Sequence, residues 1–152
     1  MRPSETIEYP IRLVWNKIAR YYNMEAAKYD TTMATGFILL NIDRNEGTPS
    51  TKLGPLLGLE PRSLVRILST MEEKGLIERR KDAGDKRLVR IHLTPFGLEK
   101  REVSKKIVLD LNHYLQSSIP ASQLEVFFEV LDTLHRKIDQ YQEVLETTNA
   151  KA

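Results

Sequence analysis

Apolar positions recur at steps of three and four along most of the chain, which is the spacing of amphipathic helices. The first such run predicts a helix over residues 11–29. Its apolar members are Ile11, Val14, Trp15, Ile18 and Tyr22. Thr32 is suited to cap a second helix, which runs through Phe37 and Leu40 to Asn45 and stops at Gly47.

Residues 50–75 have the outline of a helix-turn-helix. A short helix is predicted from Ser50 or Thr51 to Gly58, and a tight turn follows at residues 58–60. A second helix is predicted over residues 61–74, because Pro61 suits a first helical position and Gly75 is a natural C-terminal stop. One apolar stripe follows that helix, made of Leu64, Ile67, Leu68 and Met71.

The period then changes from helical to alternating. The segments "LIERRK" (76–81) and "RLVRIHL" (87–93) flank a turn at residues 82–85, where Gly84 tolerates a positive φ. Val89, Ile91 and Leu93 are expected to anchor one face of this hairpin in the core. A β-hairpin directly after a helix-turn-helix is a wing, whose charged tip can project away from the core.

Two long helices are predicted to complete the chain. The first begins at Thr94-Pro95 and runs through Leu115. The second begins at Pro120, or at Ser122 with Glu125 as a capping box, and its steps approach a heptad seam. The apolar positions of this last helix are Leu124, Phe127, Phe128, Leu131, Leu134, Ile138, Tyr141 and Leu145. Only the first few residues and those after Leu145 look loose.

Composition fits one domain of ordinary size, with 152 residues, 41% hydrophobic and 29% charged. The net charge of +2 is unevenly spread: from Arg62 to Arg90, nine Lys and Arg stand against five Asp and Glu. This segment therefore has a net charge of +4 (9 − 5) and the remainder −2. A local basic patch of this kind is typical of a polyanion-binding surface, although many solvated faces resemble it.

Several function classes find no support in the sequence. Cysteine is absent, which excludes disulfides and thiol-based redox switching within this chain. His92, His113 and His135 are scattered without acidic neighbours at metal-ligand spacing, so neither a metal site nor a cofactor is expected. No nucleophile elbow or phosphate-binding glycine loop is present, so an enzyme is not expected. No membrane segment or secretion signal is recognised, and a cytoplasmic protein is expected.

Three motifs in this order resemble the multiple-antibiotic-resistance-regulator (MarR) type of winged helix-turn-helix transcription factor. They are "GLIERR" (75–80), the wing Asp-x-Arg at 85–87, and "HLTPFG" (92–97), and the resemblance covers nearly the whole chain. It implies a mainly helical fold with a small β-hairpin wing and with N- and C-terminal dimerisation helices. Residues 31–94 would form the DNA-binding lobe, and residues 1–30 and 95–152 the dimerisation region of a single intertwined domain.

The candidate DNA-binding residues lie on the second helix of the motif and on the wing. They are Arg62, Ser63, Arg66, Asp85, Lys86 and Arg87. Arginine is the usual reader of guanine in the major groove. The resemblance implies that Arg87 enters the minor groove and that Asp85 helps to fix its direction, which suits the enhanced negative potential of a narrow groove. The alternatives are a merely solvated hairpin and surface ion pairs of the two helix arginines, for instance with Glu60.

Three positions depart from the family pattern. Glu60 stands where Ser, Thr or Asp is the more usual cap, Val65 where a polar residue is frequent, and Pro55 inside the first helix of the motif. These departures put the set of base-reading residues in doubt, but not the architecture.

The terminal helices are expected to form a homodimer. The last helix is too apolar for a lone surface helix, and the resemblance implies an interface built from the first and the last two helices. The candidate interface residues are Ile11, Val14, Leu131, Leu134, Ile138, Tyr141 and Leu145. The alternative is a helix pair within one chain.

An aromatic and methionine stripe is the candidate site for a small aromatic or amphipathic effector, in a cleft between the dimer region and the DNA lobe. Its residues are Trp15, Tyr22, Tyr29, Met33 and Phe37. A stripe of this kind is more often plain core. The expected function is therefore that of a homodimeric repressor that binds a pseudo-palindromic operator in double-stranded DNA. The alternative is a winged-helix protein–protein interaction module that has lost DNA binding.

Overall fold

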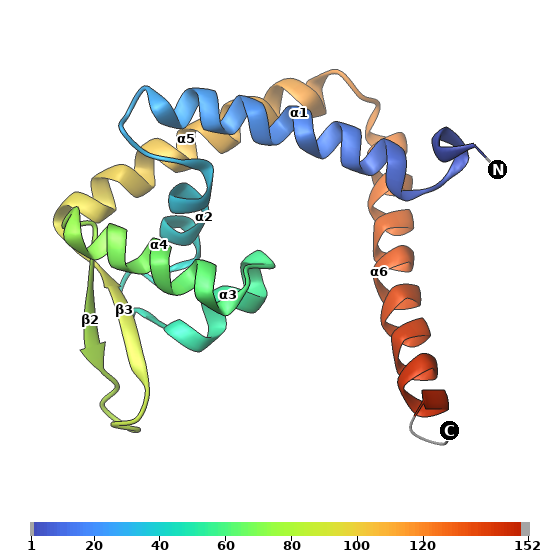
Figure 1. Cartoon of the computed structure of the whole chain (residues 1–152). Coiled ribbons are helices and arrows are strands. Elements are labelled where there is room, and N and C mark those ends of the chain that lie inside the picture. The colour runs from blue at the N-terminus through green and yellow to red at the C-terminus, as the bar shows by residue number, and fades with distance from the viewer. Residues whose placement is uncertain (1, 150–152) are drawn as a thin grey trace. The chain divides into compact units, whose positions relative to one another are not determined.

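A computed structural model describes residues 2–149, and the chain divides into two compact units between Leu109 and Asp110 (Figure 1). The first unit holds all the strands and most of the helices, and the second holds the end of α5 and α6. The sequence predicts a different division, with residues 31–94 as DNA-binding lobe and residues 1–30 and 95–152 as dimerisation region. Its boundaries do not coincide with the one between Leu109 and Asp110. That division stays a prediction, because contacts within one copy do not test assembly.

The predicted helices of the first unit are present. They are α1 (Glu8–Ala27), α2 (Met33–Asn41), α3 (Ser50–Leu57) and α4 (Pro61–Glu73), preceded by a short 3-10 turn at Pro3–Glu5. Thr32 caps α2 as predicted, since its side chain accepts a hydrogen bond from the backbone N–H of Thr35 at 3.2 Å. The positive φ of Gly58 and Gly75 ends the two helices of the helix-turn-helix.

Helix α2 ends at Asn41, earlier than the sequence suggests. The Asp43 side chain accepts hydrogen bonds from the backbone N–H groups of Asn45 (2.9 Å) and Glu46 (2.8 Å), which turns the chain away from the helix. The backbone N–H of Asp43 donates to the Thr48 hydroxyl at 2.9 Å. Residues 43–47 therefore form a tight turn, and Gly47 closes it with a φ of 67°.

The sheet has three strands, one more than the sequence predicts. The strands β1 (Thr48–Pro49), β2 (Ile77–Lys81) and β3 (Val89–Leu93) are antiparallel in the order β1-β3-β2. Thr48 and Arg79 both lie opposite Ile91, which is fully buried in the middle strand. Strand β3 starts at Val89 rather than Arg87, because Leu88 still belongs to the turn and donates to the carbonyl of Asp85 at 2.9 Å.

The core of this unit lies between α2, α3, α4 and the root of the hairpin. Its buried residues are Ile38, Leu39, Ile42, Leu53, Leu64, Leu68, Met71, Leu76, Ile77 and Ile91. The expectation that Val89 also anchors the hairpin is wrong, since 38% of that residue is exposed. The hairpin extends past the hydrophobic core at Val89, so no buried apolar residue of the described chain lies beneath its tip.

The start of α5 (Pro95–Ser117) is fixed to the end of the helix-turn-helix by Thr94. The Thr94 hydroxyl donates to the carbonyl of Gly75 at 2.6 Å and accepts from the N–H of Gly97 at 3.0 Å. This close approach leaves no room for a side chain at residue 97, where a Cβ would lie 1.9 Å from the carbonyl oxygen of Leu76.

Helix α6 (Ala121–Asn149) continues past Leu145, so the expectation of a loose end from that residue is wrong for residues 146–149. Helix α6 has no buried residue. Over the described residues, no helix is both long enough and apolar enough to traverse a lipid bilayer.

Replacing Gly97 by alanine should destabilise the fold, because the added methyl group has to displace the backbone at Leu76. We expect a loss of about 1–3 kcal/mol in the free energy of unfolding, measured by urea denaturation. Gly54→Ala in α3 is the matched control, since its Cβ would meet its nearest neighbour at 3.4 Å. Equal stability of the two variants would contradict the close approach described for α5.

Candidate DNA-binding surface

Helix α4 presents two arginines to solvent from its N-terminal half. Arg62 and Arg66 are exposed and Ser63 is half-buried, while Leu64 and Leu68 on the other face are in the core. Among residues 2–149, no carboxylate pairs with either arginine, and Glu60 makes no cap hydrogen bond. The surface ion pairs considered as an alternative are therefore not formed, and both guanidinium groups are available.

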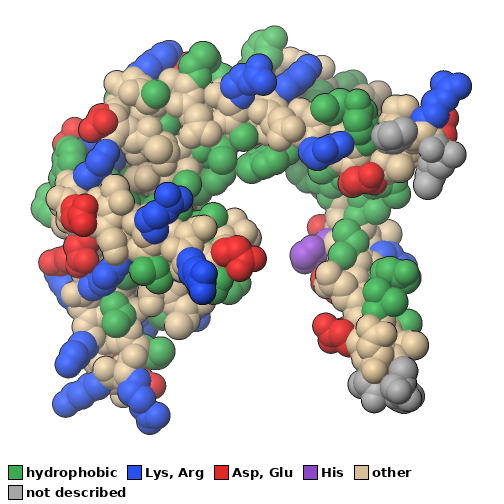
Figure 2. All heavy atoms as spheres, viewed as in Figure 1, with side chains coloured by type: hydrophobic (Ala, Val, Ile, Leu, Met, Phe, Trp, Pro, Cys, Tyr) green, Lys and Arg blue, Asp and Glu red, His purple; other side chains and the backbone are tan. Residues whose placement is uncertain are grey.

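The tip of the β2–β3 hairpin carries the predicted wing residues. The Arg87 side chain is 95% exposed, and Lys86 is exposed beside it. The Asp85 carboxylate accepts a hydrogen bond from the backbone N–H of Arg87 at 3.0 Å and lies 3.7 Å from its Nε. Figure 2 shows basic side chains gathered at this end of the hairpin. The orienting role that the resemblance implies for Asp85 stays a prediction.

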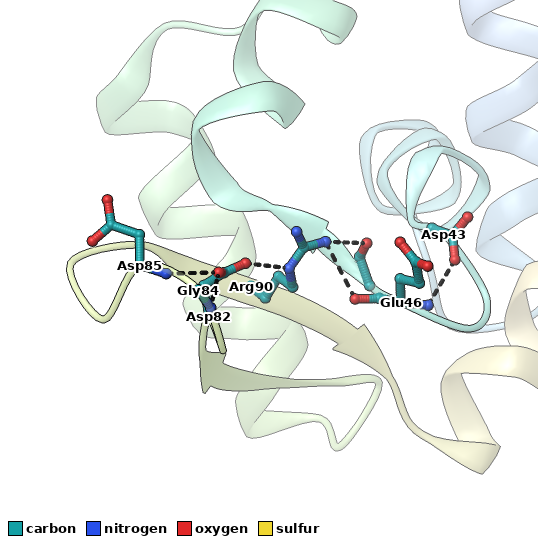
Figure 3. Close-up of polar contacts among 7 residues, drawn as sticks. Asp43, Glu46, Asp82, Gly84, Asp85 and Arg90 are labelled. Atoms are coloured by element: carbon teal, nitrogen blue, oxygen red, sulfur yellow. Dashed lines mark hydrogen bonds and ion pairs between the residues drawn. The ribbon is translucent and has the colours of Figure 1, made fainter.

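A polar cluster that sequence reasoning did not recognise lies just below this tip (Figure 3). One Asp82 oxygen accepts from the backbone N–H groups of Gly84 (2.8 Å) and Asp85 (3.0 Å), and the other from Arg90 Nε at 2.5 Å. Arg90 Nη1 in turn donates to the carbonyls of Glu46 (3.4 Å) and Gly47 (3.2 Å). Only 13% of the Asp82 side chain and 29% of the Arg90 side chain are exposed.

One signal in the sequence foreshadows this pair. Once the turn is placed at residues 82–88, Asp82 lies opposite Leu88, and Arg90 is two positions further on the same face. Diagonal neighbours of this kind lie within reach of long side chains. The pairing therefore depends on the register, which the sequence alone leaves open by one or two residues.

These contacts stabilise the charged form of Asp82. The N–H of Asp85, the guanidinium of Arg90 and the N–H of Gly84 together lower the pKa of this carboxyl from its ordinary value of 3.8 to about 2. The ion pair below the wing tip is thus fully charged throughout the neutral range.

Arg79 joins the wing to the recognition helix. Its guanidinium donates to the Ser69 hydroxyl at 3.2 Å and lies 3.5 Å from the Glu72 carboxylate, both on α4. Strand β2 and α4, which carry the two candidate DNA-binding regions, are therefore connected by polar contacts as well as by the core.

The five candidate effector residues are distributed over three hollows. Trp15, Met33 and Phe37 line one of about 460 Å³ together with Leu56, Leu57 and Leu59. The Trp15 and Phe37 rings are stacked with centroids 6.5 Å apart. Tyr22 is buried, and its ring packs edge-on against that of Phe37. It lines a second, much smaller hollow with Met33 and Phe37. Tyr29 lines a third hollow. The expectation of one cleft lined by all five is therefore wrong, since Tyr29 is separate from the rest.

The candidate dimer residues lie on exposed apolar faces. On α1, Ile11 and Val14 are 45% and 56% exposed. On α6, Ile138, Tyr141 and Leu145 are exposed, while Leu131 and Leu134 are half-buried. The sequence pattern missed three further exposed apolar residues of α6, which are Val126, Val130 and Val144.

Helices α3 and α4 with the three-stranded sheet define the protein as a winged helix-turn-helix. Residues 31–89 match the model of the MarR family. Members of this family are transcription regulators and not enzymes.

Three solved structures illustrate the likeness. The S. aureus MepR–DNA complex shares 22% identity at a TM-score of 0.80, covering 87% of this chain and 98% of that one. Wild-type MarR from E. coli in its apo form shares 25% sequence identity at a TM-score of 0.69, and the match covers 85% of this chain and 96% of that one. CouR from Rhodococcus jostii RHA1, bound to p-coumaroyl-CoA, shares 21% sequence identity at a TM-score of 0.78, and the match covers 88% of this chain and 94% of that one.

The lowered pKa of Asp82 predicts an acid-dependent contribution to stability. A carboxyl whose pKa falls from 3.8 to about 2 on folding stabilises the fold above pH 3.8, and this contribution is lost as the pH falls through about 2. The difference in Tm between wild type and Asp82→Asn should thus be constant from about pH 7 to about pH 5 and shrink below about pH 4. Glu46→Gln, which removes a nearby carboxylate but keeps the Glu46 carbonyl, should show no such change. A difference of constant size down to about pH 2 would contradict this account.

Proposed function

We propose that this regulator binds a pseudo-palindromic operator in double-stranded DNA as a homodimer and represses transcription. One observation carries the proposal: the arginines of α4 have no carboxylate partner among residues 2–149, and Arg87 at the wing tip is 95% exposed beside Asp85, while the arginines on the strands of the hairpin contact carboxylates. Arg79, Arg80 and Arg90 each contact a carboxylate on the lobe itself. Arg62 and Arg66 contact none among residues 2–149, and Arg87 projects into solvent.

The proposed binding mode follows from where these side chains lie. An α-helix fits the major groove, so the N-terminal half of α4 would place Arg62, Ser63 and Arg66 at base edges and phosphates. The wing would place Arg87 in the adjacent minor groove, with Lys86 near the phosphates. MepR, a chain of the same fold, was solved in complex with DNA, which supports DNA binding as the function.

The exposed apolar faces of α1 and α6 support the homodimer. A helix of 29 residues with no buried side chain gains little from its own unit, and a second copy would cover its seam. Two lobes related by a two-fold axis would then meet two half-sites. The operator should therefore be a pseudo-palindrome with half-sites about 10 base pairs apart, centre to centre.

The hollow at Trp15, Met33 and Phe37 supports regulation by a small molecule. Its volume of about 460 Å³ and its largely apolar lining suit a small aromatic or amphipathic effector. CouR was solved with p-coumaroyl-CoA and PcaV from Streptomyces coelicolor with its natural ligand, so chains of this fold accommodate such molecules. We propose that the effector of this protein binds here and alters its affinity for DNA.

One observation favours a second function, that of a protein–protein interaction module. Val65 on α4 is 60% exposed, and Leu56 on α3 is 62% exposed. Selection of bound fragments from random or genomic duplex DNA separates the two functions. Enrichment of a palindromic sequence supports the operator-binding regulator, and no enrichment supports the interaction module.

Arg87→Ala should weaken operator binding by about 1–3 kcal/mol, because one minor-groove contact and its attraction to phosphates are lost. The Tm should not change, since the side chain is 95% exposed. Fluorescence-anisotropy titration of the selected operator measures the effect, and Arg20→Ala on α1 is the control for loss of one exposed positive charge. Wild-type affinity of Arg87→Ala would refute the role given to the wing.

Ile138→Asp should dissociate the proposed dimer. A carboxylate in the seam carries a desolvation penalty on the order of several kcal/mol if it stays ionised. The variant should show monomer mass in light scattering and lose specific DNA binding with it, and Leu134→Asp should behave alike. Gln140→Asp, on the opposite face of α6, should remain a dimer and bind normally. If Ile138→Asp stays dimeric with full affinity, the seam is not the interface.

A further inference from the structure

Arg90 occupies an unusual place on the middle strand of the sheet. It lies opposite Pro49 of β1 and opposite Arg80 of β2, so its backbone is held from both sides. Its side chain is forked between two distant segments: Nε reaches Asp82 at the base of the wing tip, and Nη1 reaches the carbonyls of Glu46 and Gly47. Figure 3 shows this bridge.

The segment that receives Arg90 Nη1 is a fixed support. Asp43 accepts from two backbone N–H groups of this turn, and the Thr48 hydroxyl donates to the carbonyl of Asn41 at 3.3 Å. Gly47 packs so closely on β3 that a Cβ there would lie 2.6 Å from the carbonyl oxygen of Ile91. The two carbonyls that Arg90 contacts are therefore held in place by the hydrogen bonds of this turn and by its close packing on β3.

The segment on the other side of Arg90 has no apolar support. Beyond Val89 the hairpin leaves the core, and the tip residues 83–87 are all exposed. Their backbone is held by the Asp82 carboxylate, which accepts from the N–H groups of Gly84 and Asp85. Asp85 then accepts from the N–H of Arg87 and lies beside its Nε. A continuous series of polar contacts thus runs from the turn at residues 43–47, through Arg90, Asp82 and Asp85, to Arg87.

We propose that Arg90 is a positioning residue for DNA recognition: by bridging Asp82 and the 43–47 turn, it sets the direction in which the wing tip presents Arg87. The inference rests on the proposed DNA-binding function and deepens it. Arg90 itself is too enclosed, at 29% side-chain exposure, to be a principal DNA contact. The wing arginine reads the width of the minor groove, so its direction relative to α4 decides which sequences suit both elements at once.

The Arg90→Lys substitution distinguishes a positioning role of Arg90 from a role of its positive charge alone. It keeps the positive charge, but a single ammonium group cannot reproduce the fork that reaches the Asp82 carboxylate and both carbonyls. If Arg90 acts only as a positive charge, Arg90→Lys should bind like wild type. If it positions Arg87, Arg90→Lys should lose affinity, and it should lose it only while Arg87 is present.

The experiment is a double-mutant cycle on the operator selected with wild-type protein. Arg90→Lys and wild type are titrated with and without the Arg87→Ala substitution. We expect Arg90→Lys to weaken binding on the order of tenfold when Arg87 is present, and less than about twofold in the Arg87→Ala background. Hydroxyl-radical footprints should lose the minor-groove protection from the wing and keep the protection from α4.

Arg80→Lys is the matched control. Arg80 lies directly opposite Arg90 in the sheet, and its guanidinium pairs with Glu78, two positions away on the same face of β2. We expect wild-type affinity for this variant in both backgrounds. Asp82→Asn removes the other half of the bridge and should reproduce the dependence on Arg87, so the test stands even if Arg90→Lys folds poorly.

Two results would overturn the proposal. Wild-type affinity of both Arg90→Lys and Asp82→Asn would show that the bridge does not position the wing. An equal loss with and without Arg87 would show that Arg90 acts on the lobe as a whole. Failure of the underlying function is distinguishable, because wild-type protein would then select no operator at all.

Discussion

The Asp82 carboxylate fixes the backbone of the β2–β3 hairpin tip, where residues 83–87 are all exposed. It accepts two backbone N–H groups of the wing tip and the guanidinium of Arg90, and these contacts lower its pKa to about 2. Ile91 is the last fully buried apolar residue of β3 toward the tip, Val89 is 38% exposed, and residues 83–87 are all exposed. Apolar burial therefore stabilises the root of the hairpin, and polar contacts stabilise the tip that extends into solvent. This explains why so much charge is concentrated at a tight turn.

The same division between apolar and polar support organises the rest of the lobe. The root of the hairpin and both helices of the motif share one core, so their mutual geometry is fixed by burial. Thr94 fixes the start of α5 to the end of that motif through two hydrogen bonds. Arg79 adds a polar connection between β2 and α4. The surfaces left for other molecules are the arginines of α4 and the wing, and the apolar faces of α1 and α6.

Periodicity in the sequence predicts most of this fold, because the long helices and the hairpin each bury one face. It does not predict β1, because a strand of two residues, Thr48 and Pro49, is too short to show an alternation of apolar and polar positions. It overestimates the reach of the core at Val89, because alternation continues beyond the last buried layer. Of the candidate site, the exposed arginines follow from the helix face and the turn. The Asp82–Arg90 bridge does not, because it depends on the register of the strands and on a turn 43 residues away. The separation of Tyr29 from the other aromatic residues likewise depends on tertiary packing.

The central claim is that this protein binds duplex DNA through a small number of exposed basic side chains. The most direct test is the salt dependence of binding between wild-type protein and its selected duplex. The logarithm of the association constant should fall linearly with the logarithm of the salt concentration, with a slope of about −0.9 for each phosphate neutralised. With Arg62, Arg66, Lys86 and Arg87 from each of two lobes, we predict a slope of several units. Binding that does not change with salt, or the absence of binding to any duplex at low salt, would contradict the account.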